Sequence, residues 1–173
     1  NSAWGSSIRK TTFDLSFEQQ KEIASYWKKA AQEEHASIAA FARLTLQLMN
    51  LGAPPELINA SIRAQSDELS HTRACLKIVA LISGEELGPE SLNVEGISAK
   101  DMTAKSILLE TILDGCINET IAAAEAGWMA SQCSITPIQK VLQKIAEAEI
   151  AAMYQHFLGR LMYPILKPQI IPI

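Results

Sequence analysis

Aromatic residues, glycine and proline are all scarce in this 173-residue sequence. Phe, Trp and Tyr together supply only 6% of it although 48% is hydrophobic, so its apolar content is mostly alanine, leucine and isoleucine. These residues favour helices over β-sheets. Glycine occurs 8 times and proline 7 times, which argues against both a turn-rich all-β fold and a disordered chain. We therefore expect long, uninterrupted helices.

Positive charge, long apolar runs and paired cysteines are also scarce. Fifteen Lys and Arg stand against nineteen Asp and Glu, and the resulting net charge of −4 argues against a nucleic-acid-binding surface. Charges interrupt every apolar stretch before about 18 residues, so we expect neither a membrane span nor a signal peptide. The odd number of cysteines (Cys75, Cys116 and Cys133) indicates reduced thiols and a cytoplasmic protein.

Apolar residues recur at helical spacing in four segments. A capping box of Ser16 and Gln19 opens the first helix, and Thr136 followed by Pro137 opens the fourth. The only long connection is rich in glycine and lies between the second and third helices, as in a crossover between two helix pairs. The sequence predicts an all-α four-helix bundle, with helices from 17 to about 50, from Pro54 and Pro55 to about 83, from 98 to about 131, and from 136 onward.

Three parts are expected along the chain: a leader at residues 1–15, the bundle at 16–162 and a tail at 163–173. The prolines in the tail prevent it from continuing a helix. Because an exposed apolar ribbon would invite aggregation, we expect the tail to lie across the bundle or against a second subunit.

Each predicted helix carries one glutamate in the middle of its apolar stripe: Glu34, Glu68, Glu119 and Glu149. On the third helix that stripe is expected to contain Leu108, Ile112 and Cys116 as well. Burying one ionised carboxylate without a partner costs several kcal/mol, and four would repel one another. No lysine or arginine lies on these stripes near the glutamates. One or two divalent metal ions are the simplest compensation.

His71 follows Glu68 by three residues. This spacing puts imidazole and carboxylate one turn apart on the same side of a helix, so both can reach one metal layer. Carboxylates and imidazole in this ratio suit iron or manganese, with zinc a third choice and copper disfavoured. Cys75 and Cys116 are expected to line the interior nearby as small apolar residues.

In their joint order, these motifs resemble those of ferritin-like di-iron carboxylate proteins, and especially bacterial ferritin-like domain proteins, over residues 27–160. The resemblance implies a ferritin-like bundle whose ligands Glu34, Glu68, His71, Glu119 and Glu149 hold two iron ions, or manganese. The segments that carry it are Glu34-His35-Ala36-Ser37, Phe41-Ala42-Arg43-Leu44, Gly52-Ala53-Pro54-Pro55-Glu56-Leu57, Asp67-Glu68-Leu69-Ser70-His71, Gly115-Cys116-Ile117-Asn118-Glu119-Thr120 and Ile145-Ala146-Glu147-Ala148-Glu149.

One position departs from that family pattern. The pattern places a histidine three residues after Glu149, where this sequence has Ala152. His156 lies one turn further, about 6 Å along the helix axis, so it reaches the site only through a local π-bulge or a shifted register. Three alternatives stay open: an open coordination position, a position filled by His156 or water, and reduced occupancy with one metal ion or none.

The resemblance implies a non-haem di-iron oxidase or oxygenase that acts with dioxygen on a small organic substrate. One alternative is a ferroxidase that handles iron, and another is a bundle with a degenerate metal site and a binding role. We expect no nucleic-acid or membrane partner, and a homodimer or larger oligomer.

Overall fold

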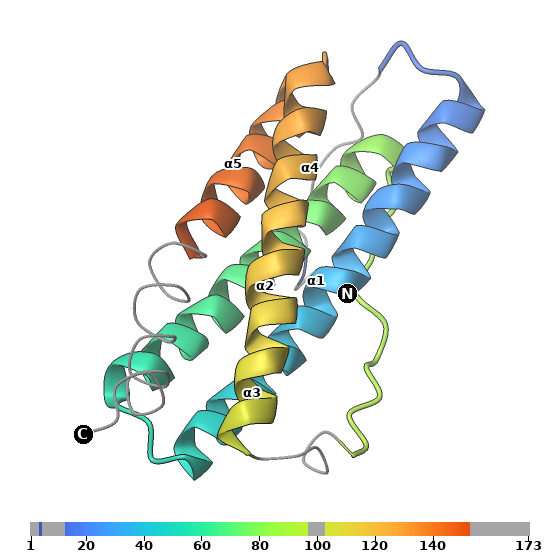
Figure 1. Cartoon of the computed structure of the whole chain (residues 1–173). Helices are drawn as coiled ribbons and strands as arrows, with labels where there is room; N and C mark the ends of the chain where they lie inside the picture. The colour runs from blue at the N-terminus through green and yellow to red at the C-terminus, as the bar shows by residue number, and fades with distance from the viewer. Residues whose placement is uncertain (1–3, 5–12, 97–102, 153–173) are drawn as a thin grey trace. The chain divides into compact units, whose positions relative to one another are not determined.

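The computed structural model describes residue 4, residues 13–96 and residues 103–152, and all the regular structure in those residues is helical (Figure 1). Helices α3, η1 and α4 follow one another without a break, so the described residues form four long helices, as predicted. The all-α prediction is confirmed, and the long connection after α2 lies where it was expected. None of the described helices is long and apolar enough to cross a membrane. The elements are α1 Phe17–Asn50, α2 Pro55–Ser83, α3 Ala104–Glu110, η1 Thr111–Asn118, α4 Glu119–Gln132 and α5 Thr136–Ala152.

Helix α1 begins and ends as its sequence predicts. The backbone N–H of Ser16 donates to the Gln19 side chain at 2.8 Å, and the N–H of Gln19 donates to the Ser16 hydroxyl at 3.2 Å. This is the predicted capping box. At the other end, Gly52 has a φ of 65°, and its N–H and that of the next residue bond back to carbonyls of the last turn. Glycine suits this left-handed position because it has no Cβ.

The third long helix differs from the prediction in its start and in its middle. It begins at Ala104, after an N-cap at Thr103 whose side chain accepts a hydrogen bond from the N–H of Ser106. The predicted start at residue 98 lies outside the described residues. Its middle, η1, is a π-helix of eight residues, in which each turn takes one residue more than an α-turn.

The wider π-turn corrects the predicted buried face. We expected Leu108 and Ile112 on that face, but the buried residues are Ile107 and Thr111, at 0% and 6% exposure. From Cys116 onward the predicted face holds. Thr111 and Cys116 are separated by one π-turn of five residues. The buried residues up to and including Thr111 therefore lie one position earlier in the sequence than predicted.

The described residues divide into two compact units, and α1 and α2 contribute to both. The first unit contains the described residues up to Ala40, together with Gln65–Glu95. An ion pair of 3.6 Å between Lys28 and Glu90 joins α1 to the connection after α2. The most buried side chains of this first unit include Trp27 and Ala31 from α1 and Cys75, Ile78 and Ile82 from α2.

The second unit contains Phe41–Ala64 and the described residues after Gly96. In it, the Thr45 and Ser61 hydroxyls of α1 and α2 are 2.9 Å apart, and Ser61 also donates to a backbone carbonyl of α1. Arg43 pairs with Glu110 of α3 at 3.2 Å. Helix α4 packs along α5. The core cluster of this second unit is formed by Phe41, Leu44, Leu48, Leu57, Ala64, Ile107 and Cys116.

Candidate metal centre

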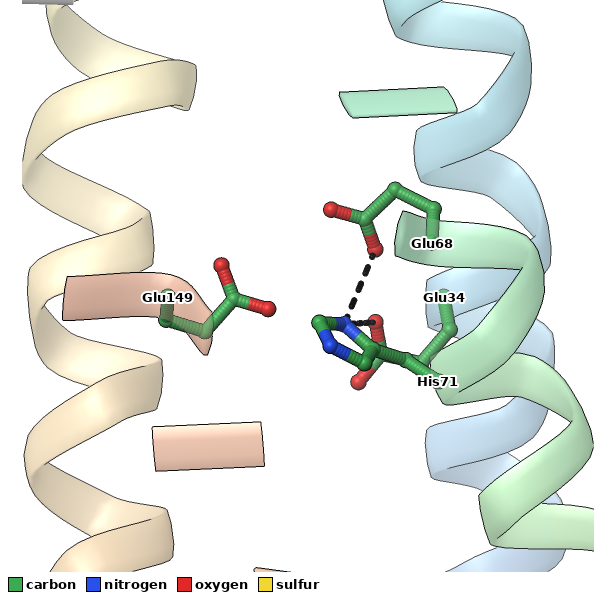
Figure 2. Close-up of side chains that lie close together, drawn as sticks. All are labelled: Glu34, Glu68, His71 and Glu149. Carbon is green, nitrogen blue, oxygen red and sulfur yellow. Dashed lines mark ion pairs between the residues drawn. The ribbon is translucent and has the colours of Figure 1, made fainter. Parts of the chain in front are cut away.

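Two acids and a histidine meet between α1 and α2 in the first unit. Nδ1 of His71 lies 3.6 Å from Oε2 of Glu34 and 3.7 Å from Oε2 of Glu68 (Figure 2). Glu68 and His71 are 4% and 7% exposed, while Glu34 is half-buried. The predicted one-turn relation between Glu68 and His71 therefore places both side chains against the carboxylate of α1.

The local sequence of α2 explains why these polar side chains are turned inward. Glu68 lies one turn after the buried Ala64 and one turn before the wholly buried Thr72. The Thr72 hydroxyl donates to the backbone carbonyl of Glu68 at 2.8 Å, which satisfies a polar group that would otherwise be costly to bury. Asp67, next to Glu68, is exposed. Two adjacent acids on one helix thus have opposite surroundings.

Glu34 is held ionised by its neighbours. Burial by itself raises the pKa of Glu34, but hydrogen bonds with His71 and Glu68 and the positive charge of His71 outweigh burial, so its pKa lies below the ordinary value. These neighbours therefore favour the ionised form of the Glu34 carboxyl group.

Cys75 contributes to the wall of this site, one turn beyond His71. Its side chain is 1% exposed. Burial raises the pKa of the Cys75 thiol, and the negative charges of Glu34 and Glu68 raise it further. The thiol therefore stays protonated and acts as a small apolar neighbour, as the sequence predicts.

The potential ligand group has four members. Each of Glu34, Glu68, His71 and Glu149 offers one ligand atom, and these atoms all lie within 4.8 Å of one another (Figure 2). Glu149 comes from α5 and is 4% exposed. The sequence predicted all four residues. It did not predict the buried Thr72, which follows His71 and was not included in the apolar stripe.

Three other positions from the sequence analysis, Glu119, His156 and Ala152, are not among these four residues. Glu119, the first residue of α4, is half-buried and is not part of the group of four. It stays a prediction. His156 lies outside the described residues. Ala152, which stands where the family pattern has a histidine, is the last residue of α5.

This donor set fits a hard or borderline metal ion. Three carboxylates and one imidazole suit iron, manganese or zinc, and the set contains no thiolate to favour copper(I). With all three acids ionised, the group would carry three negative charges inside the protein. Repulsion on that scale has to be offset by protons or by a cation. A divalent ion could be held by the same ligand atoms.

Comparison with known protein families, with curated proteins and with solved structures finds no match. The chemistry of the site therefore rests on its own residues and geometry.

Proposed function

We propose that this protein binds iron or manganese through Glu34, Glu68, His71 and Glu149 and uses the metal to oxidise a small organic substrate with dioxygen. The observation that supports the proposal is the convergence of three carboxylates and one imidazole within 4.8 Å. Such a group is expensive to bury without a cation. Natural sequences keep such costs mainly where function needs them.

Two metal ions are proposed, with Glu119 as a further ligand. Four ligand atoms are enough for one ion, but a pair of ions needs bridging carboxylates and additional donors. Glu119 is half-buried at the point where η1 gives way to α4. π-helical turns are often found at functional sites, which supports a role for this helix in the site. Glu119 is also the one further ligand that the ferritin-like resemblance implies beyond the group of four.

Bound iron or manganese would supply redox chemistry with dioxygen. The protein supplies the surroundings. Carboxylate and imidazole groups bind a metal only in their deprotonated forms, so metal affinity should rise with pH. The buried positions of Glu68 and His71 keep bulk water from the ligands.

Ala152 is consistent with an active site as well as with a weakened one. A missing protein ligand leaves room for dioxygen, substrate or water at the metal. The proposed partners are therefore dioxygen and a small molecule, with no nucleic acid or membrane. The three free cysteines support a cytoplasmic location.

The test of this function is to load the protein with Fe(II) in the absence of oxygen, then add dioxygen and measure its consumption. Wild-type protein should consume dioxygen rapidly and then stop once the site iron is oxidised. Addition of a reductant should restart consumption. The Glu68→Gln variant should lose this activity, while Asp67→Asn, which changes the neighbouring exposed acid, should keep it.

Two outcomes separate the alternatives. Oxygen consumption that continues in proportion to added Fe(II), without a reductant, would favour the ferroxidase reading over substrate oxidation. Equal oxygen consumption by wild-type protein and Glu68→Gln would contradict any role of this site in the chemistry.

A further inference from the structure

A row of exposed side chains runs along α3, η1 and α4 with a strict spacing of four residues. Its four central members are apolar, and each is about half exposed: Leu109 at 51%, Leu113 at 55%, Ile117 at 47% and Ile121 at 53%. A lysine, Lys105, extends the row at one end, and an acid, Glu125, extends it at the other; both are exposed. The row is therefore apolar in its middle and oppositely charged at its ends.

The π-helix keeps this row on one face. In an α-helix, four residues overshoot a full turn by about 40°, so a long row at this spacing would wind around the helix. In a π-helix, with its wider turn, four residues fall short of a full turn instead. Since η1 occupies the centre of the row, from Thr111 to Asn118, its undershoot cancels much of the overshoot on either side. This unusual segment therefore produces a straight apolar seam.

Helix α4 carries large apolar residues on its exposed side, while small apolar residues fill its buried side. Its buried side consists of alanines, including Ala123 and Ala126, while its exposed side carries Ile121 and Trp128, the latter 66% exposed. A helix with one face in water ordinarily has a polar outer face. From residue 106 to residue 139 the sequence contains no lysine or arginine. An apolar seam on such a surface indicates a protein partner.

We propose that the partner is a second copy of this chain, which binds along the same seam in the antiparallel direction. The row is self-complementary about Gly115. When two copies are related by a two-fold axis that passes through the seam midway between Leu113 and Ile117, at the level of Gly115, the seam pairs Leu109 with Ile121 and Leu113 with Ile117. The same register sets Lys105 of each copy opposite Glu125 of the other, so the interface gains two charge pairs by symmetry.

The seam is small for a permanent interface. Four half-exposed aliphatic side chains and Trp128 make up a patch of a few hundred Å², whereas stable complexes bury about 800 Å² on each partner. We therefore expect a reversible dimer with a Kd in the micromolar range. This proposal does not depend on the metal centre, because none of the potential metal ligands lies in the row.

Sedimentation velocity of the full chain over a range of concentrations tests the dimer. Wild-type protein should pass from monomer to dimer as its concentration rises. Leu113→Lys, at the centre of the seam, should weaken the dimer by at least roughly tenfold, because it puts two like charges at the contact. A matched control is Ile62→Lys, which changes a 50% exposed isoleucine of α2 that is not a member of the row. It should dimerise as wild-type protein does.

Charge reversal tests the antiparallel register. Lys105→Glu and Glu125→Lys should each weaken self-association several-fold, since each puts like charges opposite one another. The double variant should recover the wild-type Kd. A mixture of the two single variants should form a heterodimer more readily than either variant forms a homodimer.

A wild-type protein that stays monomeric at all concentrations would overturn the proposal and leave the seam to another occupant. So would a dimer that is unaffected by Leu113→Lys. A dimer that responds to Leu113→Lys but not to either charge reversal would overturn the proposed register. Circular dichroism of each variant checks that the helices are intact.

Discussion

His71 Nδ1 lies 3.6 Å from the Oε2 atom of Glu34, which links α2 to α1 at a site where charge is costly. The nearby imidazole helps to lower the pKa of Glu34, so an ionised carboxylate is tolerated here despite its partial burial. A bound cation would stabilise the same carboxylate.

The metal-free protein should lose stability in acid through Glu34. Because the pKa of Glu34 is lower in the folded protein than in the unfolded chain, the folded state binds fewer protons near this pKa. The stabilisation is therefore complete above about pH 4.5 and is lost as the pH falls through the lower, folded-state pKa. Urea unfolding of metal-free protein between pH 7 and pH 3 measures this loss.

The Glu34→Gln variant should show a weaker dependence of unfolding free energy on pH than wild-type protein. The control is Glu33→Gln, because Glu33 is exposed and pairs with Lys29 on the same helix. It should keep the wild-type dependence. Identical curves for wild-type protein and Glu34→Gln would show that the His71 contact does not stabilise the ionised carboxylate.

The three cysteines should differ in their reaction with a thiol reagent. Cys75 is buried and its pKa is raised by burial and by nearby carboxylates, so it should react only after unfolding. Cys116 should also react slowly, because burial raises its pKa. Cys133, which is half-buried, should react first. Mass spectrometry of peptides after timed iodoacetamide labelling gives the order, and early labelling of Cys75 would contradict its position in the wall of the site.

Substitution of Ala152 should test the missing ligand. Ala152→His places an imidazole three residues after Glu149, in the spacing that Glu68 and His71 show on α2. If the position faces the metal, the affinity for Fe(II) or Mn(II) should rise roughly tenfold, since an added imidazole is a strong ligand for these ions. Ala151→His is the control, because Ala151 is exposed. Equal metal affinities for both variants would contradict the alignment of the fourth helix.

Helix ends and site residues on α1 and α2 could be predicted from the sequence because their signals are local. The capping box at Ser16 and the glycine turn at Gly52 depend on neighbouring residues, and both formed as expected. The inward direction of Glu68 and His71 follows from helical periodicity. These features need no information from distant parts of the chain.

The π-helix could not be predicted in the same way. Periodicity with a fixed 3.6-residue turn placed Ile112 on the buried face, whereas Thr111 is buried. A π-turn gains its stability from tertiary packing that favours the wider register, and no single residue signals it. The pairing of Glu34 with His71 likewise depends on how α1 and α2 pack, and the sequence pattern alone did not fix which acid the imidazole faces.

Metal content after anaerobic incubation with Fe(II) or Mn(II), followed by removal of free metal, tests the central claim most directly. The account predicts about one to two ions per chain in wild-type protein and in Asp67→Asn, and a large loss in Glu68→Gln and Glu149→Gln. Glu147→Gln is the control for Glu149→Gln, because Glu147 is exposed on the same helix. A folded wild-type protein that retains no metal, or metal content that is equal in all variants, would contradict it.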